Sequence, residues 1–340
     1  MGVAVLILSP AAIVVAALLW MIILPRVAHR RDAGSGSGTS PAVATPDASH
    51  GLQVALEGHI RAVASHPHNV QHPGALEAAA RYIEEQVKRF GLTPLLHVFE
   101  VDGVAVRNIE IVFEPASGAG KAETIVAGAH YDADHDSPGA HDNGTGVAAL
   151  LEITRALALD PPATNVKRLR IVFFVNEEQP YGKTPDMGSW RHAMALKDSG
   201  EKVGGMIALE TLGYFSMTPG SQKLPFPFNF IYPNAGYFIA FVGLPGSRRF
   251  LSRTVRAFRS ASDFPSTGTC VPDFIAGADL SDHWAYRQAG FAAIMATDTA
   301  IYRNPFYHQT YDRPETVNYA ALAEITLGLE GCVRQLIAPE

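Results

Sequence analysis

The spacing of apolar residues along the chain predicts an α/β fold. From Leu76 to Phe90 apolar side chains recur at helical intervals, and Gly91 follows as the expected C-cap. Short apolar runs predict strands at 95–101, 108–113, 124–129, 169–175 and 206–209, and two further helices at 147–157 and 187–196. Strands that alternate with helices indicate a largely parallel sheet covered by helices on both faces.

A long apolar segment lies near the N-terminus. No charged residue occurs from Val3 to Leu24, and the segment is long enough to cross a bilayer as one helix. We therefore expect a membrane anchor at residues 1–25, with a cleaved signal peptide as the alternative. Residues 26–50, rich in Gly, Ser, Ala, Pro and Thr, are expected to form a flexible linker, and residues 51–340 a globular domain.

Composition narrows the possible partners and ligands. The net charge is −6 and the pI about 6.1, so we expect no nucleic-acid partner. Two cysteines, Cys270 and Cys332, are too few for a thiolate zinc site, and their spacing does not say whether they pair. The segment 224–245 is rich in Pro, Phe and Tyr, and we expect it to be an insertion or a rim beside a pocket.

Acidic residues and histidines follow the predicted strands at several places. In open α/β sheets, ligands bind at the carboxyl ends of the strands. The groups are His130-Tyr-Asp132, Asp142 in a glycine-rich turn, the pair Glu177-Glu178, Glu210, and His308 in a late loop. Each has an ordinary alternative when taken alone, such as a helix cap, a solvated acidic pair or a surface histidine.

Taken together, these groups match the needs of a two-metal site. They supply two imidazoles and three carboxylates as ligands, with Asp132 to support a histidine and one further carboxylate to spare. Nitrogen and oxygen ligands suit zinc, and two zinc ions can share a bridging carboxylate and activate a water. Acidic side chains beside a buried strand are costly unless a metal or a reaction uses them. The pattern therefore predicts a hydrolytic zinc site.

In these motifs the chain resembles the M28 zinc metallopeptidases, co-catalytic aminopeptidases of the bacterial leucyl-aminopeptidase type. The resemblance spans roughly residue 51 to the C-terminus, and the motifs occur in family order. They are Gly128-Ala-His-Tyr-Asp132, Ser137-Pro-Gly-Ala-His-Asp-Asn-Gly-Thr-Gly146, Phe174-Val-Asn-Glu-Glu178, Ile207-Ala-Leu-Glu-Thr-Leu-Gly213, Ser281-Asp-His283 and Asn304-Pro-Phe-Tyr-His308. The resemblance implies a three-layer α/β/α fold with a mixed, mostly parallel central sheet, of the zinc-dependent exopeptidase type.

The resemblance also implies a set of metal ligands. His130 and Glu210 would hold one zinc ion, Glu178 and His308 would hold the other, and Asp142 would bridge the two. The best-known members of the family have aspartate where this chain has Glu210. Glutamate is one methylene longer and keeps the same ligand chemistry.

Other residues would act around the metals. Glu177 is expected to be the general base, and Asp132 the carboxylate behind the metal-binding His130. The segment that contains Asp282 and His283 is expected to line the pocket or support the ligands. His141 lies next to a ligand in the sequence and is expected near the site.

The activity implied is zinc-dependent release of N-terminal residues from peptides. A glutaminyl-cyclase-like acyl transfer, which typically uses one zinc ion, and a non-catalytic binding ectodomain that lost its metals are the alternatives. The complete ligand set favours hydrolysis. The sequence leaves open the preferred side chain, dipeptidase or carboxypeptidase action, and the oligomeric state.

The membrane orientation has two readings. Arg26, Arg30 and Arg31 follow the apolar segment, and the positive-inside rule would place the domain in the cytoplasm. The resemblance implies the opposite side. We expect a membrane-anchored protein with an extracytoplasmic catalytic domain, and a secreted protein as the alternative.

Overall fold

The computed structural model describes residues 46–116, 118, 122–162, 164–226 and 228–339. The expected anchor at 1–25 and the linker up to residue 45 lie outside the described residues. Within the part that is described, no helix is both long and apolar enough to span a bilayer. Helix α2 (Pro46–Val63) includes residues 46–50, which the sequence had suggested for the linker.

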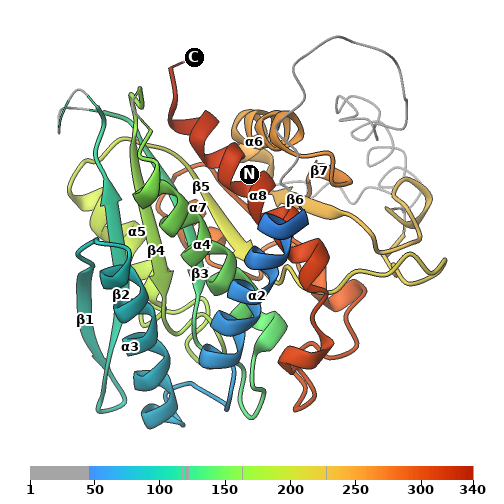
Figure 1. The fold of residues 1–340 in the computed structure, drawn as a ribbon, viewed down its shortest axis with the longest axis horizontal. Helices are drawn as coiled ribbons and strands as arrows, with labels where there is room; N and C mark the ends of the chain where they lie inside the picture. The colour runs from blue at the N-terminus through green and yellow to red at the C-terminus, as the bar shows by residue number, and fades with distance from the viewer. Residues whose placement is uncertain (1–45, 117, 119–121, 163, 227, 340) are drawn as a thin grey trace, which may run out of the picture.

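A mixed β-sheet forms the centre of the fold (Figure 1). Its described strands are β1 (Leu95–Val101), β2 (Val104–Phe113), β3 (Thr124–His130), β4 (Arg168–Phe174), β5 (Val203–Glu210), β6 (Ile239–Gly243), β7 (Ser266–Cys270) and β8 (Ala293–Thr297). They lie in the order β1-β2-β4-β3-β5-β8-β6-β7. The four central strands from β4 to β8 pair in parallel, as do β6 and β7, whereas β1–β2, β2–β4 and β6–β8 pair antiparallel. The predicted mixed, mostly parallel sheet is confirmed.

Helices cover both faces of the sheet, so the fold has three layers. One face carries α3 (Pro73–Arg89), α4 (Thr145–Leu159), α6 (Arg248–Ala261) and α8 (Tyr319–Ile337), with α2 packed on α4 and α8. The other face carries α5 (Gly188–Asp198) and α7 (His283–Gln288). Side chains of β3 point alternately to the two faces. Ile125 packs in the core on the side of α4, and Val126 packs in the core on the side of α5 and α7.

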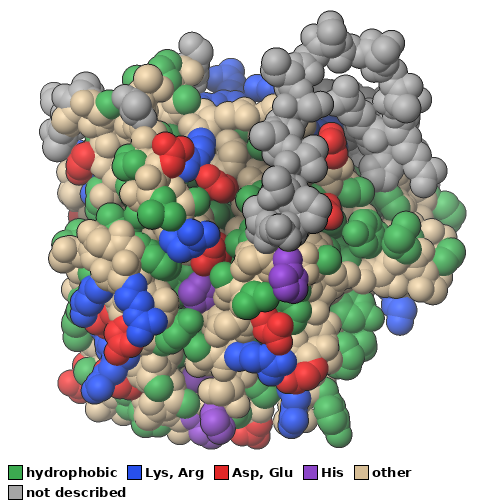
Figure 2. Space-filling model, viewed as in Figure 1, with side chains coloured by type: hydrophobic (Ala, Val, Ile, Leu, Met, Phe, Trp, Pro, Cys, Tyr) green, Lys and Arg blue, Asp and Glu red, His purple; other side chains and the backbone are tan. Residues whose placement is uncertain are grey.

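Short helical turns join these elements. They are the π-helical turn η1 (Ala140–Gly144) and the 3₁₀ turns η2 (Phe228–Phe230), η3 (Pro245–Ser247), η4 (Ala300–Tyr302) and η5 (Pro314–Thr316). On the face shown in Figure 2, basic and acidic side chains lie next to one another. Among the surface ion pairs, Arg61 contacts both Glu57 and Glu315. The face shown in Figure 2 therefore carries no broad field of one charge.

The predicted helices and strands are confirmed, and other elements were missed. Gly91 has a φ of +80° just after α3, as expected of a helix C-cap. The strands β3 and β4 were recognisable because both of their faces are buried, so their sequences are continuous apolar runs. The segment 224–245 is only partly irregular, since it contains β6. Both described cysteines, Cys270 and Cys332, are free and buried.

Candidate metal centre

The predicted histidines and carboxylates come together at the carboxyl ends of β3, β4 and β5. His130 is the last residue of β3, and Glu210 is the last residue of β5. Glu178 follows β4, Asp142 lies in η1 before α4, and His308 lies in the loop after η4. Parallel neighbours end at the same edge of a sheet, so residues distant in sequence converge there.

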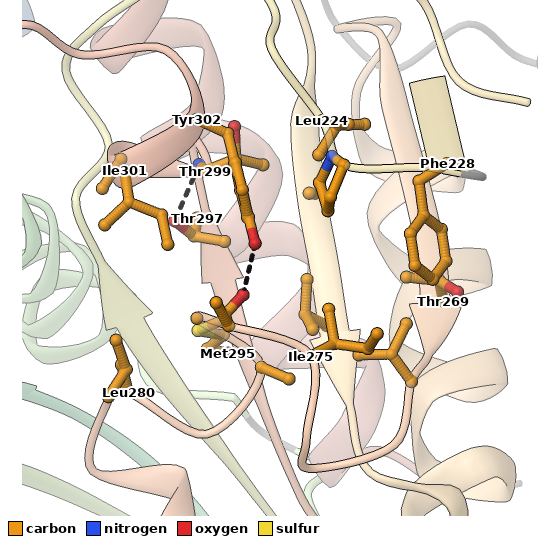
Figure 3. A pocket seen from close by; sticks show the side chains of 18 of the residues that line it. Leu224, Phe228, Thr269, Ile275, Leu280, Met295, Thr297, Thr299, Ile301 and Tyr302 are labelled. Carbon is orange, nitrogen blue, oxygen red and sulfur yellow. Dashed lines mark hydrogen bonds between the residues drawn. The ribbon is translucent and has the colours of Figure 1, made fainter. Parts of the chain in front are cut away.

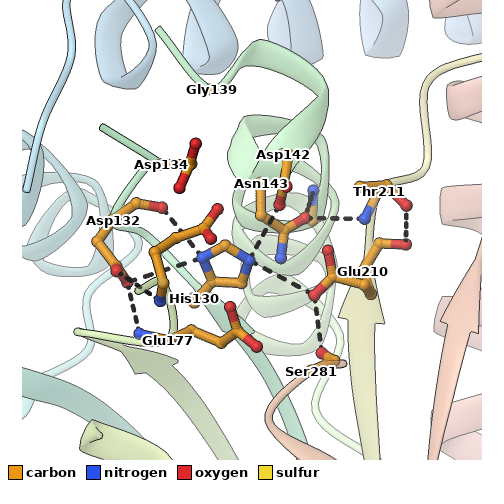
Figure 4. Close-up of polar contacts among 12 residues, drawn as sticks. His130, Asp132, Asp134, Gly139, Asp142, Asn143, Glu177, Glu210, Thr211 and Ser281 are labelled. Carbon is orange, nitrogen blue, oxygen red and sulfur yellow. Dashed lines mark hydrogen bonds and ion pairs between the residues drawn. The ribbon is translucent and has the colours of Figure 1, made fainter. Parts of the chain in front are cut away.

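Asp142 lies between the two histidines. Its Oδ1 is 3.2 Å from Nε2 of His130, a contact drawn in Figure 4. Its Oδ2 is 3.0 Å from Nε2 of His308. Nε2 of His130 also lies 3.4 Å from Oε2 of Glu210, and Nε2 of His308 lies 3.4 Å from Oε1 of Glu178. Each imidazole therefore faces one carboxylate of its own and one oxygen of the shared Asp142.

Several atoms at the centre of this cluster are buried without a hydrogen-bond partner among the described residues. They are Nε2 of His130, Oδ1 of Asp142, Oε1 of Glu178 and Nε2 of His308. A buried polar atom without a partner costs about 1–3 kcal/mol, and more when it is charged. These are the atoms that face one another, and they are of the types that bind zinc. The residues present therefore fit a metal site.

The charges of the cluster are poorly compensated by the protein. Burial raises the pKa of Glu178 to about 8, helped by the nearby charge of Asp142. Burial likewise raises the pKa of Glu210 to about 7, against the charge of His130. Three carboxylates in one buried place repel one another, and divalent cations would offset that repulsion.

Asp132 holds the Glu177–Glu178 segment. Its Oδ1 accepts a hydrogen bond from the backbone N–H of Glu177, and its Oδ2 accepts one from that of Glu178, each at 3.1 Å. His130 Nδ1 lies 3.7 Å from the Asp132 carboxylate and 3.0 Å from the Asp132 backbone carbonyl. In this structure the His130 ring therefore contacts the Asp132 carbonyl more closely than the Asp132 carboxylate, which accepts two backbone amides.

Glu177 lies beside the cluster without joining its ion pairs. Its carboxylate makes no hydrogen bond or ion pair with another described residue, although it lies close to His130 and Glu178. Burial raises the pKa of Glu177 well above its usual value, and Glu178 adds to the shift while His130 opposes it. A carboxylate with a raised pKa holds a proton more strongly than an ordinary one, as a proton-transfer group must.

Two side chains support the cluster. Ser281 belongs to the segment that was expected to line the pocket or support the ligands, whereas Asp312 had no assigned role. The Ser281 hydroxyl donates a hydrogen bond to Oε2 of Glu210 at 2.7 Å. The carboxylate of Asp312 accepts hydrogen bonds from the backbone N–H groups of His141 at 2.8 Å and Asp142 at 3.1 Å. Both supports lie in or beside the recognised motifs, which is the only sequence signal for them.

Asn143 and Asp134 add two further contacts. Oδ1 of Asn143 accepts hydrogen bonds from the N–H groups of Gly146 and Thr211, both at 3.1 Å, and its Nδ2 donates to the carbonyl of Leu209 at 2.8 Å. Asn143 therefore ties the start of α4 to the end of β5. Oδ2 of Asp134 lies 3.6 Å from Nδ1 of His308, on the side of the ring away from Asp142.

The remaining predicted residues take different positions. Burial raises the pKa of Asp282 to about 7, and its fully buried carboxylate makes no hydrogen bond among the described residues. His283 is 2.9 Å from the carbonyl of Ala278, and His141 is 3.0 Å from the hydroxyl of Thr316. The imidazoles of His283 and His141 thus bond to other parts of the fold and not to the five side chains of the cluster.

An apolar pocket lies next to the cluster, because Glu210 belongs to both. Tyr307 is also among its lining residues. Figure 3 shows the pocket from close by. Phe228, Ile275 and Met295 also line it, from segments well apart in the sequence. The expectation that the segment 224–245 borders a pocket is confirmed.

Comparison with known sequences identifies a family. The family model described as Peptidase family M28 matches residues 108–330. The uncharacterized protein YfbL of Escherichia coli (strain K12) is 33% identical over 323 residues, which cover 92% of this chain and 95% of YfbL.

Solved structures show the same fold at low sequence identity. The aminopeptidase from Aneurinibacillus sp. strain AM-1 aligns with a TM-score of 0.64 at 15% identity, covering 86% of this chain and 97% of that one. BSAP, a zinc aminopeptidase from Bacillus subtilis, has a TM-score of 0.52 at 20% identity, with coverage of 70% and 52%. A Bacteroides thetaiotaomicron glutaminyl cyclase has a TM-score of 0.59 at 17% identity, with coverage of 86% and 98%.

The substitution Asp132→Asn should destabilise the protein. An amide offers only one acceptor oxygen, so the N–H of Glu177 or Glu178 would face an NH₂ group. We expect the free energy of unfolding to fall by about 1–3 kcal/mol in denaturant titrations run with a chelator. Asp136→Asn is the matched control, since its side chain is 83% exposed. Equal unfolding free energies for the two variants would contradict the role given to Asp132.

Proposed function

The chain belongs to peptidase family M28, and we propose that it is a zinc-dependent aminopeptidase. The observation that carries this proposal is the position of Asp142 between two imidazoles, each of which also faces a second carboxylate. Structural neighbours with the same fold include aminopeptidases, one of them described as a zinc enzyme. The complete donor set favours a catalytic protein over a binding ectodomain.

We assign the ligands of two zinc ions as follows. His130 and Glu210 would hold one ion, Glu178 and His308 would hold the other, and Asp142 would contribute one oxygen to each. The buried unpaired atoms of His130, Asp142, Glu178 and His308 support this assignment. Glu210 reaches the cluster despite its extra methylene, and the Ser281 hydroxyl orients it. When bound, two zinc ions lower the pKa of a shared water towards neutrality and polarise a substrate carbonyl.

Glu177 is the proposed proton carrier. Its carboxylate stands beside the ligands and is not engaged by another described residue, so it can accept a proton from the attacking water. The raised pKa of Glu177 suits it to give that proton to the leaving amine nitrogen. Asp132 fixes the backbone from which Glu177 projects, through the amides of Glu177 and Glu178.

The apolar pocket supports a preference for substrates with an apolar N-terminal side chain. It adjoins the proposed ligand Glu210, so a side chain placed there would lie beside the scissile bond. Val242 of β6 and Met295 of β8 line its wall. Burial of a leucine-sized side chain contributes about 1.5–3 kcal/mol of binding free energy.

A substrate panel tests the proposed function. Aminoacyl amides and dipeptides are incubated with the full-length protein, with and without a chelator, and the products are identified by mass. We expect loss of one N-terminal residue, faster for leucine than for alanine or lysine, and abolished by the chelator. Val242→Phe should reduce kcat/KM for leucine substrates more than for alanine substrates, because the larger ring would fill the pocket.

The same panel separates the alternatives. A peptide with an N-terminal glutamine that is cyclised without losing a residue would favour acyl transfer of the glutaminyl-cyclase kind. No turnover of any substrate by zinc-loaded protein would favour a binding ectodomain. Release of C-terminal residues would place the protein among the carboxypeptidases.

The substitution Glu177→Gln should separate catalysis from metal binding. It removes the proton acceptor but leaves the proposed ligands, so we expect turnover to fall by a factor of at least about 10² with unchanged zinc content. His308→Ala should instead lower the zinc content, because it removes a proposed ligand. Glu100→Gln, at an exposed position, is the control and should behave as the wild type. Near-normal turnover of Glu177→Gln would remove Glu177 from this role.

We also propose that residues 1–25 anchor the protein in a membrane, with the catalytic domain outside the cytoplasm. The uncharged apolar run from Val3 to Leu24 supports this proposal. In fractionated cells the full-length protein should remain with the membranes after an alkaline carbonate wash. A chain shortened by its first residues, recovered from the medium, would indicate secretion after cleavage instead.

A further inference from the structure

A second cluster of imidazole and carboxylate groups lies outside the candidate metal centre. His97, Glu110 and His192 each offer one ligand atom, and these atoms lie within 4.8 Å of one another. Of the groups of this kind among the described residues, it is the one that shares no residue with the centre around Asp142. The proposed peptidase mechanism makes no use of it.

The cluster forms between the sheet and α5. In the pairing of β1 with β2, Leu95 lies opposite Glu110, so the side chains of these two residues are on the same face of the sheet. His97 comes two residues after Leu95 and therefore projects from that face as well. His192 belongs to α5, which covers that face. Glu110 and His192 are buried, whereas the side chain of His97 is 47% exposed on the edge strand. The cluster is therefore buried on one side and open to solvent on the other.

Both imidazoles point a nitrogen at the same carboxylate. Nε2 of His97 lies 2.6 Å from Oε2 of Glu110, and Nε2 of His192 lies 3.5 Å from Oε1. The two rings are 5.7 Å apart, centre to centre, and nearly perpendicular at 83°. Two ligands about 2.0–2.1 Å from a tetrahedral zinc ion lie roughly 3.3 Å apart, so His97 would need to swing outward slightly. Its exposed position leaves room for that movement.

Neighbouring residues orient the two buried ligands. Nδ1 of His192 is hydrogen-bonded to the hydroxyl of Tyr286 at 2.6 Å, which turns Nε2 towards Glu110. Arg170 donates a hydrogen bond to Oε1 of Glu110 at 2.5 Å and is itself held by Glu201. Metal-binding histidines and carboxylates are commonly held in this way by a second partner.

The simpler reading is an ion-pair network of Arg170, Glu110 and His97. Nε2 of His192 is a third group directed at the same carboxylate, 3.5 Å from Oε1 of Glu110. Each imidazole thus faces the carboxylate with its Nε2 atom, as two ligands of one ion would. Two imidazoles and one carboxylate are a donor set that suits zinc.

We propose that His97, Glu110 and His192 bind a divalent transition-metal ion of the zinc type, separate from the peptidase centre. Nε2 of each histidine and a carboxylate oxygen of Glu110 are the ligands, and a solvent-facing position stays open. Bound metal would connect the edge strand β1 to β2 and α5. This site does not depend on the proposed peptidase activity.

Zinc content measures this site directly. Wild type and His97→Gln, both full length, are equilibrated with a zinc buffer, and zinc per chain is determined by elemental analysis. Glutamine keeps a hydrogen-bond donor for Glu110 but is a poor zinc ligand. We expect His97→Gln to hold one zinc ion fewer than the wild type, and His66→Gln, at another exposed histidine, to match the wild type. Equal zinc content in wild type and His97→Gln would overturn the proposal.

Two further measurements keep the outcome clear. His308→Ala should lose zinc from the candidate centre, and adding His97→Gln to it should still remove one more ion. This readout stands even if the protein proves to have no peptidase activity. Added Zn²⁺ should also raise the melting temperature of metal-stripped wild type more than that of metal-stripped His97→Gln, and Mg²⁺ should raise neither. An equal rise for both proteins, or with Mg²⁺, would contradict imidazole ligation at this site.

Discussion

The two oxygens of the Asp142 carboxylate face two different imidazoles, those of His130 and His308. The other side chains of the candidate centre lie around these two contacts. Buried carboxylates this close together repel one another, and buried unpaired atoms are costly. A bound cation would offset both the repulsion between the carboxylates and the cost of their buried unpaired atoms. The side chains that converge there are zinc ligands by chemistry, which makes cation binding the simplest physical reason for their arrangement.

The topology of the sheet explains how such distant residues meet. β4, β3, β5 and β8 are parallel neighbours, so their carboxyl ends form one edge, and the loops that follow carry the cluster. Asp142 is not used as a helix cap, because Asn143 accepts the hydrogen bond from the start of α4. Asp312 instead binds the backbone of Asp142 from the other side. The carboxylate of Asp142 is thereby left free for the histidines.

The sequence predicted the parts of the fold that are buried on both faces. β3 and β4 are continuous apolar runs, and the acids and histidines that follow them were recognisable for that reason. The five-residue strands β6, β7 and β8 were not predicted. β7 has small or polar residues, whereas β6 and β8 are apolar but short. The hydrogen bonds that Asp132 accepts from the backbone of Glu177 and Glu178 were not predicted, because every residue other than proline has a backbone amide to donate. The cluster of His97, Glu110 and His192 depends on strand register and helix placement, which spacing along one chain does not reveal.

The central claim is that Asp142 joins two metal positions. Anomalous diffraction at the zinc edge, from crystals of zinc-equilibrated protein, tests it most directly. We predict two peaks at this edge of the sheet, about 3.5–4 Å apart. One should lie beside His130 and Glu210, the other beside Glu178 and His308, with Asp142 between them. A single peak, or a pair that does not contact Asp142, would contradict the account.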